Sequence, residues 1–88
     1  MIERPATIVN QEGLHARPAA RIVRLASSFA SDIEIMKDGV GVNAKSIMGV
    51  MMLAAECGSQ ITIRADGPDA EQALSALAEL VASGFGEP

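Results

Sequence analysis

The chain has 88 residues, 49% of them hydrophobic, which is enough for one domain with a core and too little for two. Its formal net charge of -4 at pH 7 argues against a nucleic acid or an anionic membrane as its main partner. No apolar stretch reaches the roughly 18 residues of a membrane-spanning helix, and no basic segment followed by an apolar one opens the chain. We expect one monomeric, cytoplasmic domain over residues 1–88, without an export signal or membrane insertion.

Few residues carry obvious chemistry. The single cysteine, Cys57, cannot form an internal disulfide, and together with the single histidine, His15, it does not make a metal site. The cysteine usage also indicates the cytosol. We therefore expect neither a metal nor any other cofactor.

The first part of the chain predicts a strand, a loop and a helix. Residues 2–9 have the composition of a strand and lead into a polar, flexible run at residues 10–13. From Ala16 onward, apolar residues recur at the spacing of a helix that packs one face on a core, and Pro18 is tolerated in its first turn. The apolar positions are Ile22, Leu25, Ala26 and Phe29.

The middle of the chain predicts a hairpin and a short helix. Residues 32–37 alternate as a half-buried strand does, and Asp38 with Gly39 forms a turn into a second strand at residues 40–42. Residues 47–55 then predict a short helix, which Gly58 closes in a left-handed conformation.

The last part predicts one more strand and one more helix. Apolar and polar residues alternate over residues 61–65, which predicts a strand. A helix follows at about residues 69–82, with Leu74, Leu77 and Val81 as its buried stripe. Residues 84–88 have the composition of a loose tail. The order β-α-β-β-α-β-α predicts the α+β class, with an antiparallel sheet and helices on one face.

His15 stands where the first long helix is expected to begin. The first N–H groups of a helix lack intrahelical partners and lie at its positive end, so they bind anions readily. Arg17 would oppose that positive end unless an anion were present, and Arg21 and Arg24 make the region locally basic. Neutral imidazole is a nucleophile near physiological pH, so we interpret His15 as a phosphohistidine site. The plainer alternative is a solvated or capping histidine.

The short helix after Ser46 is the second candidate region. Ser46 is a natural N-cap, and it is also a candidate for regulatory phosphorylation, which would add negative charge to the surface. The helix has more apolar residues than one face can bury, which predicts an exposed, adaptable patch of Ile47, Met48 and Met51. Methionines that fill gaps in the core are the alternative.

Two motifs, GLHARPA at residues 13–19 and KSIMGVMM at residues 45–52, resemble HPr, the histidine-containing phosphocarrier family of the bacterial phosphotransferase system. The similarity spans nearly the whole chain. It implies an open-faced β-sandwich, with a four-stranded antiparallel sheet and three helices on one face.

The resemblance also implies roles for particular residues. His15 would accept a phosphoryl group from enzyme I, which phosphoenolpyruvate charges, and pass it to an enzyme IIA, while Arg17 neutralises the phosphoryl oxygens. Ser46 would be the target of the HPr kinase/phosphorylase, which uses ATP and magnesium. The patch of Ile47, Met48 and Met51 would be the docking surface. Such a protein is a carrier in sugar or nitrogen pathways and not an independent catalyst.

Some features leave alternatives open. Glu12 replaces a small polar residue of many relatives, and its carboxylate would tune the lifetime of a phosphorylated His15. The end of the chain is similar to nitrogen-branch relatives, whereas KSIMGVMM is closer to members regulated at the serine. A non-catalytic regulatory binding domain of the same fold is one rival, although such relatives usually lack the histidine. A ferredoxin-like domain for a small ligand is the other, and it explains the strand order but neither motif.

Overall fold

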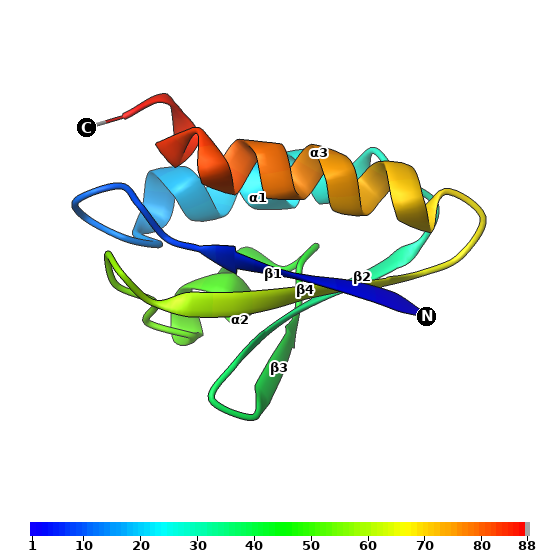
Figure 1. The fold of residues 1–88 in the computed structure, drawn as a ribbon, viewed down its shortest axis with the longest axis horizontal. Coiled ribbons are helices and arrows are strands. Elements are labelled where there is room, and N and C mark those ends of the chain that lie inside the picture. The colour runs from blue at the N-terminus through cyan, green and yellow to red at the C-terminus, as the bar shows by residue number, and fades with distance from the viewer. Residues whose placement is uncertain (88) are drawn as a thin grey trace.

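The computed structural model describes residues 1–87 and has the predicted β-α-β-β-α-β-α order, followed by one short 3-10 turn (Figure 1). Its elements are β1 (Ile2–Thr7), α1 (Ala16–Ser27), β2 (Asp32–Lys37), β3 (Val40–Asn43), α2 (Ile47–Met52), β4 (Gln60–Asp66), α3 (Ala70–Ala82) and η1 (Gly84–Gly86). The four strands form one antiparallel sheet in the order β1-β4-β2-β3. The α+β class is therefore confirmed.

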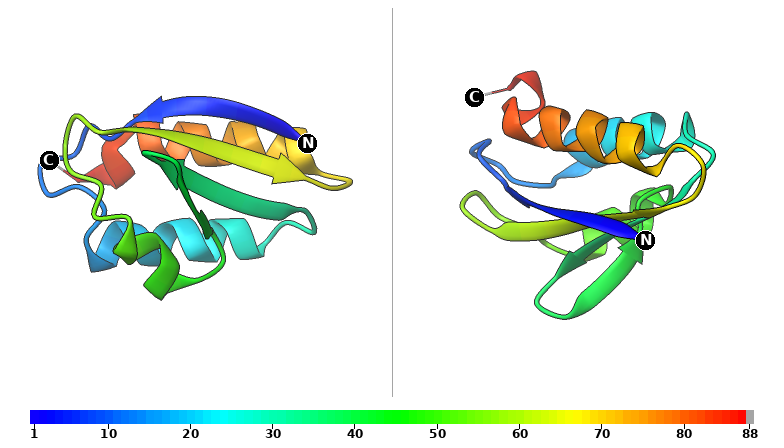
Figure 2. Two further views of the ribbon diagram at one scale, coloured as in Figure 1. Left: turned by 90° about the horizontal axis from the view of Figure 1, so that it is seen from below. Right: turned by 45° about the vertical axis from the view of Figure 1, so that its right-hand side comes forward.

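Helices α1 and α3 lie side by side over one face of the sheet, as both views of Figure 2 show. Helix α3 packs on β1 and β4, while the shorter α2 contacts α1 and β3. No helix within residues 1–87 is long and apolar enough to cross a membrane.

The core lies between the sheet and the two long helices because the apolar residues alternate along the strands and recur along the helices. In β4, Ile61, Ile63 and Ala65 are buried, whereas the residues between them are partly exposed. The expected stripe of α3, which is Leu74, Leu77 and Val81, is buried as predicted.

The ends of two elements and the role of Gly58 differ from the predictions. Strand β1 ends at Thr7 and not at residue 9, and the Ile8 backbone then pairs with the turn at Gly58 and Ser59. Helix α2 ends at Met52, because Ala54 adopts a positive φ of 50°. Gly58 also has a positive φ, but it lies in the turn before β4 and does not close the helix.

The expectation of a loose tail at residues 84–88 was wrong for the described part. The Phe85 side chain is only 1% exposed, and a short 3-10 turn carries it into the core. Gly84, Phe85 and Gly86 all have positive φ, a conformation that costs glycine little, so the two glycines allow this tight turn. Pro88 lies outside the described residues.

Candidate functional site

His15 occupies the N-cap position of α1 and accepts the first helical hydrogen bond, from the Ala19 N–H to its own carbonyl at 3.0 Å. The loop before it is fixed by Leu14, which is 4% exposed and donates its N–H to the Ala55 carbonyl at 2.9 Å. Gly13 packs directly against that carbonyl, and a Cβ atom there would collide with the Ala55 oxygen. The core thus sets the position of His15.

The first turn of α1 offers free backbone donors beside the ring. The N–H groups of Ala16 and Arg17 precede the first intrahelical bond, and the third helical residue, Pro18, has no N–H group. The first turn contains no acidic residue that would compete for these donors. The first turn of α1 therefore has the unpaired donors and the positive helix end at which an anion was expected from the sequence.

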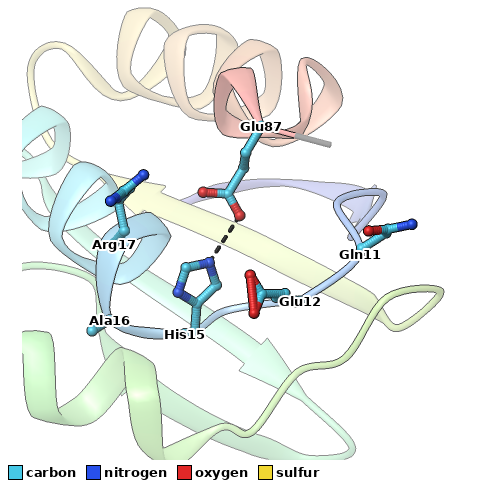
Figure 3. Close-up of a pocket in the computed structure, with 6 residues that line it drawn as sticks. All are labelled: Gln11, Glu12, His15, Ala16, Arg17 and Glu87. Atoms are coloured by element: carbon cyan, nitrogen blue, oxygen red, sulfur yellow. Dashed lines mark hydrogen bonds and ion pairs between the residues drawn. The ribbon is translucent and has the colours of Figure 1, made fainter.

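The ring of His15 is open to solvent on one side. Its side chain is 36% exposed and lines an open pocket with Gln11, Glu12, Ala16, Arg17 and Glu87 (Figure 3). A sealed, inward-facing ring would have excluded a carrier role, and the structure shows the opposite. The site is accessible to another protein.

Glu87 is a residue of this site that was not predicted from the sequence. Its Oε1 atom lies 2.8 Å from Nε2 of His15, although the two residues are 72 positions apart. Asn10, itself 1% exposed, donates from Nδ2 to the same Glu87 oxygen at 3.1 Å and to the Gly13 carbonyl at 2.8 Å. The one available signal was Phe85 between two glycines, an aromatic residue in a chain with only 2% aromatics.

Glu87 remains ionised in these surroundings. The hydrogen bond with His15 is the main cause that lowers the pKa of the Glu87 carboxyl below its usual value of 4.5, and Asn10 and the charge of Arg17 lower it further. Partial burial acts in the opposite direction but does not prevail. The carboxylate is therefore an acceptor for the imidazole at neutral pH.

The charge around the ring differs from the sequence-based expectation of a basic region. Arg17 lines the pocket beside His15, and no ion pair engages it within residues 1–87. Arg21, however, donates from its guanidinium to the Phe85 carbonyl. The pocket thus combines one free guanidinium with the carboxylates of Glu12 and Glu87 (Figure 3).

Ser46 is the N-cap of α2, as the sequence predicted. Its hydroxyl oxygen accepts a hydrogen bond from the Gly49 N–H at 3.2 Å, and the residue is half-buried. Ile47, Met48 and Met51 are 41%, 68% and 40% exposed, so these methionines do not fill the core. Because α2 packs against α1, the exposed patch and His15 lie on neighbouring elements.

The family of this chain follows from its similarity to known proteins. A family model described as the phosphorylation site of the HPr component of the phosphotransferase system matches residues 2–83. The chain belongs to the HPr family. It is 51% identical to the phosphocarrier protein HPr of Cupriavidus necator over 87 aligned residues. The alignment covers 99% of this chain and 98% of that protein.

Solved structures of HPr agree with this assignment. The crystal structure of HPr-C-His from Thermoanaerobacter tengcongensis superposes with a TM-score of 0.96 at 49% identity, over 100% of this chain and 99% of that one. The HPr-like protein Crh of Bacillus subtilis is 46% identical over 81 residues, which is 92% of this chain and 95% of Crh. The chain is a phosphocarrier of the phosphotransferase system, a phosphoryl-transfer intermediate and not a catalyst.

Proposed function

We propose that His15 accepts a phosphoryl group from phosphorylated enzyme I and passes it to an enzyme IIA in the cytoplasm. The observation that carries this proposal is the location of the only histidine, at the start of α1 with a solvent-accessible ring. A family model for a phosphorylation site matches the segment that contains it. The carrier acts as a monomer and needs neither a metal nor another cofactor at His15.

The chemistry at this site is mainly positioning. In phosphoryl transfer the negative charge of the transition state lies on the equatorial oxygens, so aligned N–H groups and a guanidinium supply most of the stabilisation. The N–H groups of Ala16 and Arg17 would provide these donors, together with the guanidinium of Arg17, which forms no ion pair within residues 1–87. An open pocket also suits a carrier, because the phosphoryl group must leave again easily.

The exposed patch of Ile47, Met48 and Met51 is the docking surface in this proposal. It lies on α2, next to the helix that bears His15, so a partner that reaches the ring meets the patch as well. Methionine side chains adapt to different surfaces, which suits a protein that binds enzyme I and an enzyme IIA in turn.

Ser46 is the proposed regulatory phosphorylation site, with an HPr kinase/phosphorylase as the enzyme that modifies it. Its place beside the exposed patch supports this role, because a phosphate there adds about two negative charges to the docking surface. The hydroxyl that accepts from the Gly49 N–H is the group to be modified.

A regulatory binding domain without phosphoryl transfer is the second candidate. The similarity to Crh, the catabolite repression HPr of Bacillus subtilis, favours it. The presence of His15 with its free donors argues against this alternative.

Incubation with phosphoenolpyruvate and purified enzyme I separates the two candidates. We expect an acid-labile phosphate on the wild type and none on His15→Ala. A label retained by His15→Ala, or no label on the wild type, would overturn the assignment.

A further inference from the structure

The contact between His15 and Glu87 is made at one ring nitrogen only. Nε2 lies 2.8 Å from the carboxylate, and Nδ1 has no hydrogen-bond partner in the described part of the chain. An ionised carboxylate only accepts hydrogen bonds, so Nε2 must carry the hydrogen. In the neutral ring, the lone pair then belongs to Nδ1.

The free nitrogen faces the start of the helix. Figure 3 shows the ring edge opposite Glu87 on the side of Ala16, where the first turn of α1 begins. A phosphoryl group bonded to Nδ1 would therefore lie near the unpaired N–H groups of that turn. The tautomer that Glu87 selects is the one that directs the nucleophilic lone pair to the anion site.

The carboxylate is held in place by several independent contacts. Asn10 is almost fully buried and binds both the Glu87 carboxylate and the Gly13 carbonyl, so it links the C-terminal segment to the loop before His15. Phe85 anchors the same segment in the core, and Arg21 of α1 donates to the Phe85 carbonyl. The segment is thus fixed to the helix whose N-terminus it approaches.

We propose that Glu87 is a positioning residue for His15: its carboxylate keeps the proton on Nε2, so that Nδ1 presents its lone pair at the start of α1. This inference rests on the proposed function, because it assumes that the ring accepts a phosphoryl group.

With this tautomer, the transfer of the phosphoryl group to His15 needs no group that accepts a proton. The lone pair of Nδ1 forms the bond to phosphorus, while the bond from phosphorus to the donor atom of enzyme I breaks and leaves its electron pair on the donor. The proton stays on Nε2, so the phosphorylated ring of His15 becomes cationic and faces the Glu87 carboxylate. Opposite charges stabilise this ring. The positive ring is also the better leaving group when the phosphoryl group moves on.

The test compares the ring of His15 in four full-length proteins by long-range ¹H–¹⁵N NMR at a pH where the ring is neutral. The wild type should show the Nε2–H tautomer. Glu87→Ala removes the acceptor, so the Nδ1–H tautomer should appear. Glu87→Gln keeps an oxygen that accepts the same hydrogen bond, so it should resemble the wild type. Glu12→Ala is the matched control, because it removes a carboxylate from the same pocket that makes no hydrogen bond to His15 within residues 1–87.

Phosphoryl exchange with enzyme I is the second readout. Loss of a buried hydrogen bond to a charged acceptor changes an equilibrium or rate constant by about tenfold or more. The ring of His15 is partly exposed, so the effect is smaller here. We expect Glu87→Ala to exchange the phosphoryl group about three- to tenfold more slowly than the wild type. Glu87→Gln should exchange faster than Glu87→Ala.

Two results would overturn the role of Glu87. One is a Glu87→Ala protein that keeps the wild-type ring spectrum and exchange rate. The other is a Glu87→Gln or Glu12→Ala protein whose ring spectrum changes as that of Glu87→Ala does. If the wild type takes no acid-labile phosphate, the proposed function fails, whereas the ring spectra of the unphosphorylated proteins still decide the role of Glu87.

Discussion

Arg17 shares the pocket with His15, and its exposed guanidinium has no ion-pair partner among residues 1–87. Arg17→Glu should slow phosphoryl exchange with enzyme I by about tenfold to a hundredfold, because a donor for the equatorial oxygens is replaced by a like charge. The fold should persist, since the side chain is outside the core. Rapid-quench measurement of the exchange rate tests this.

Arg4→Glu is the matched control for Arg17→Glu. It makes the same change of charge at an exposed position of β1, away from the pocket. Its exchange rate should stay close to that of the wild type. An Arg17→Glu protein that exchanges as fast as Arg4→Glu would show that Arg17 does not clamp the phosphoryl oxygens.

The C-terminal turn η1 is the element that brings Glu87 to His15. Phe85→Ala should lower the free energy of unfolding by about 3–5 kcal/mol, because it leaves a cavity where a buried aromatic ring was. Urea denaturation measures this loss. Met52→Ala, at a position 78% exposed, should change the stability by less than about 0.5 kcal/mol. Equal effects of the two substitutions would contradict the anchoring of the segment.

Helix α2 begins at Ser46 and carries the exposed patch. Aspartate is as good an N-cap as serine, so Ser46→Asp should keep the helix while adding a negative charge beside the patch. We expect about tenfold weaker binding to enzyme I, measured by calorimetry. Ser75→Asp places the same charge on an exposed position of α3 and should bind as the wild type does. If Ser46→Asp binds enzyme I with unchanged affinity, the patch is not part of the surface that binds enzyme I.

At the scale of the whole molecule, Asp69 ties two distant segments together. Its carboxylate accepts hydrogen bonds from the Ser31 hydroxyl at 2.5 Å, the Ser31 N–H at 2.9 Å and the Ala30 N–H at 2.9 Å. The Ser31 hydroxyl is the main cause that lowers the pKa of this carboxyl below 3.8, and the Ala30 N–H adds to it. The start of α3 is thereby joined to the turn before β2.

A lowered pKa makes this contribution depend on pH. The stabilisation is fully present above the ordinary pKa of Asp69, near 3.8, and is lost as the pH falls through the lower value of the folded state. The difference in unfolding free energy between wild type and Asp69→Asn should therefore be largest above about pH 4 and shrink below it. Urea titrations from pH 2 to pH 7 test this. A difference between wild type and Asp69→Asn that stays constant over this pH range would contradict the linkage.

Features that depend on neighbouring residues could be predicted from the sequence. Apolar periodicity gave the strand and helix order, and local spacing placed His15 at a helix start and Ser46 at an N-cap. Contacts between residues far apart in the sequence could not be predicted from local patterns. Glu87 meets His15 across 72 positions, and Asp69 meets Ser31 across 38, so both depend on the completed fold. The loose tail was predicted wrongly because the glycines on both sides of Phe85 are typical of a flexible segment, whereas Phe85 is buried in the core.

The central claim is that the ring of His15 carries a phosphoryl group between two proteins. A ³¹P NMR spectrum of the chain after reaction with phosphoenolpyruvate and enzyme I tests it most directly. We expect one phosphoramidate signal that couples to the ring protons of His15 and disappears when an enzyme IIA is added. A phosphoester signal in its place, or a phosphoramidate signal that persists in His15→Ala, would contradict the claim.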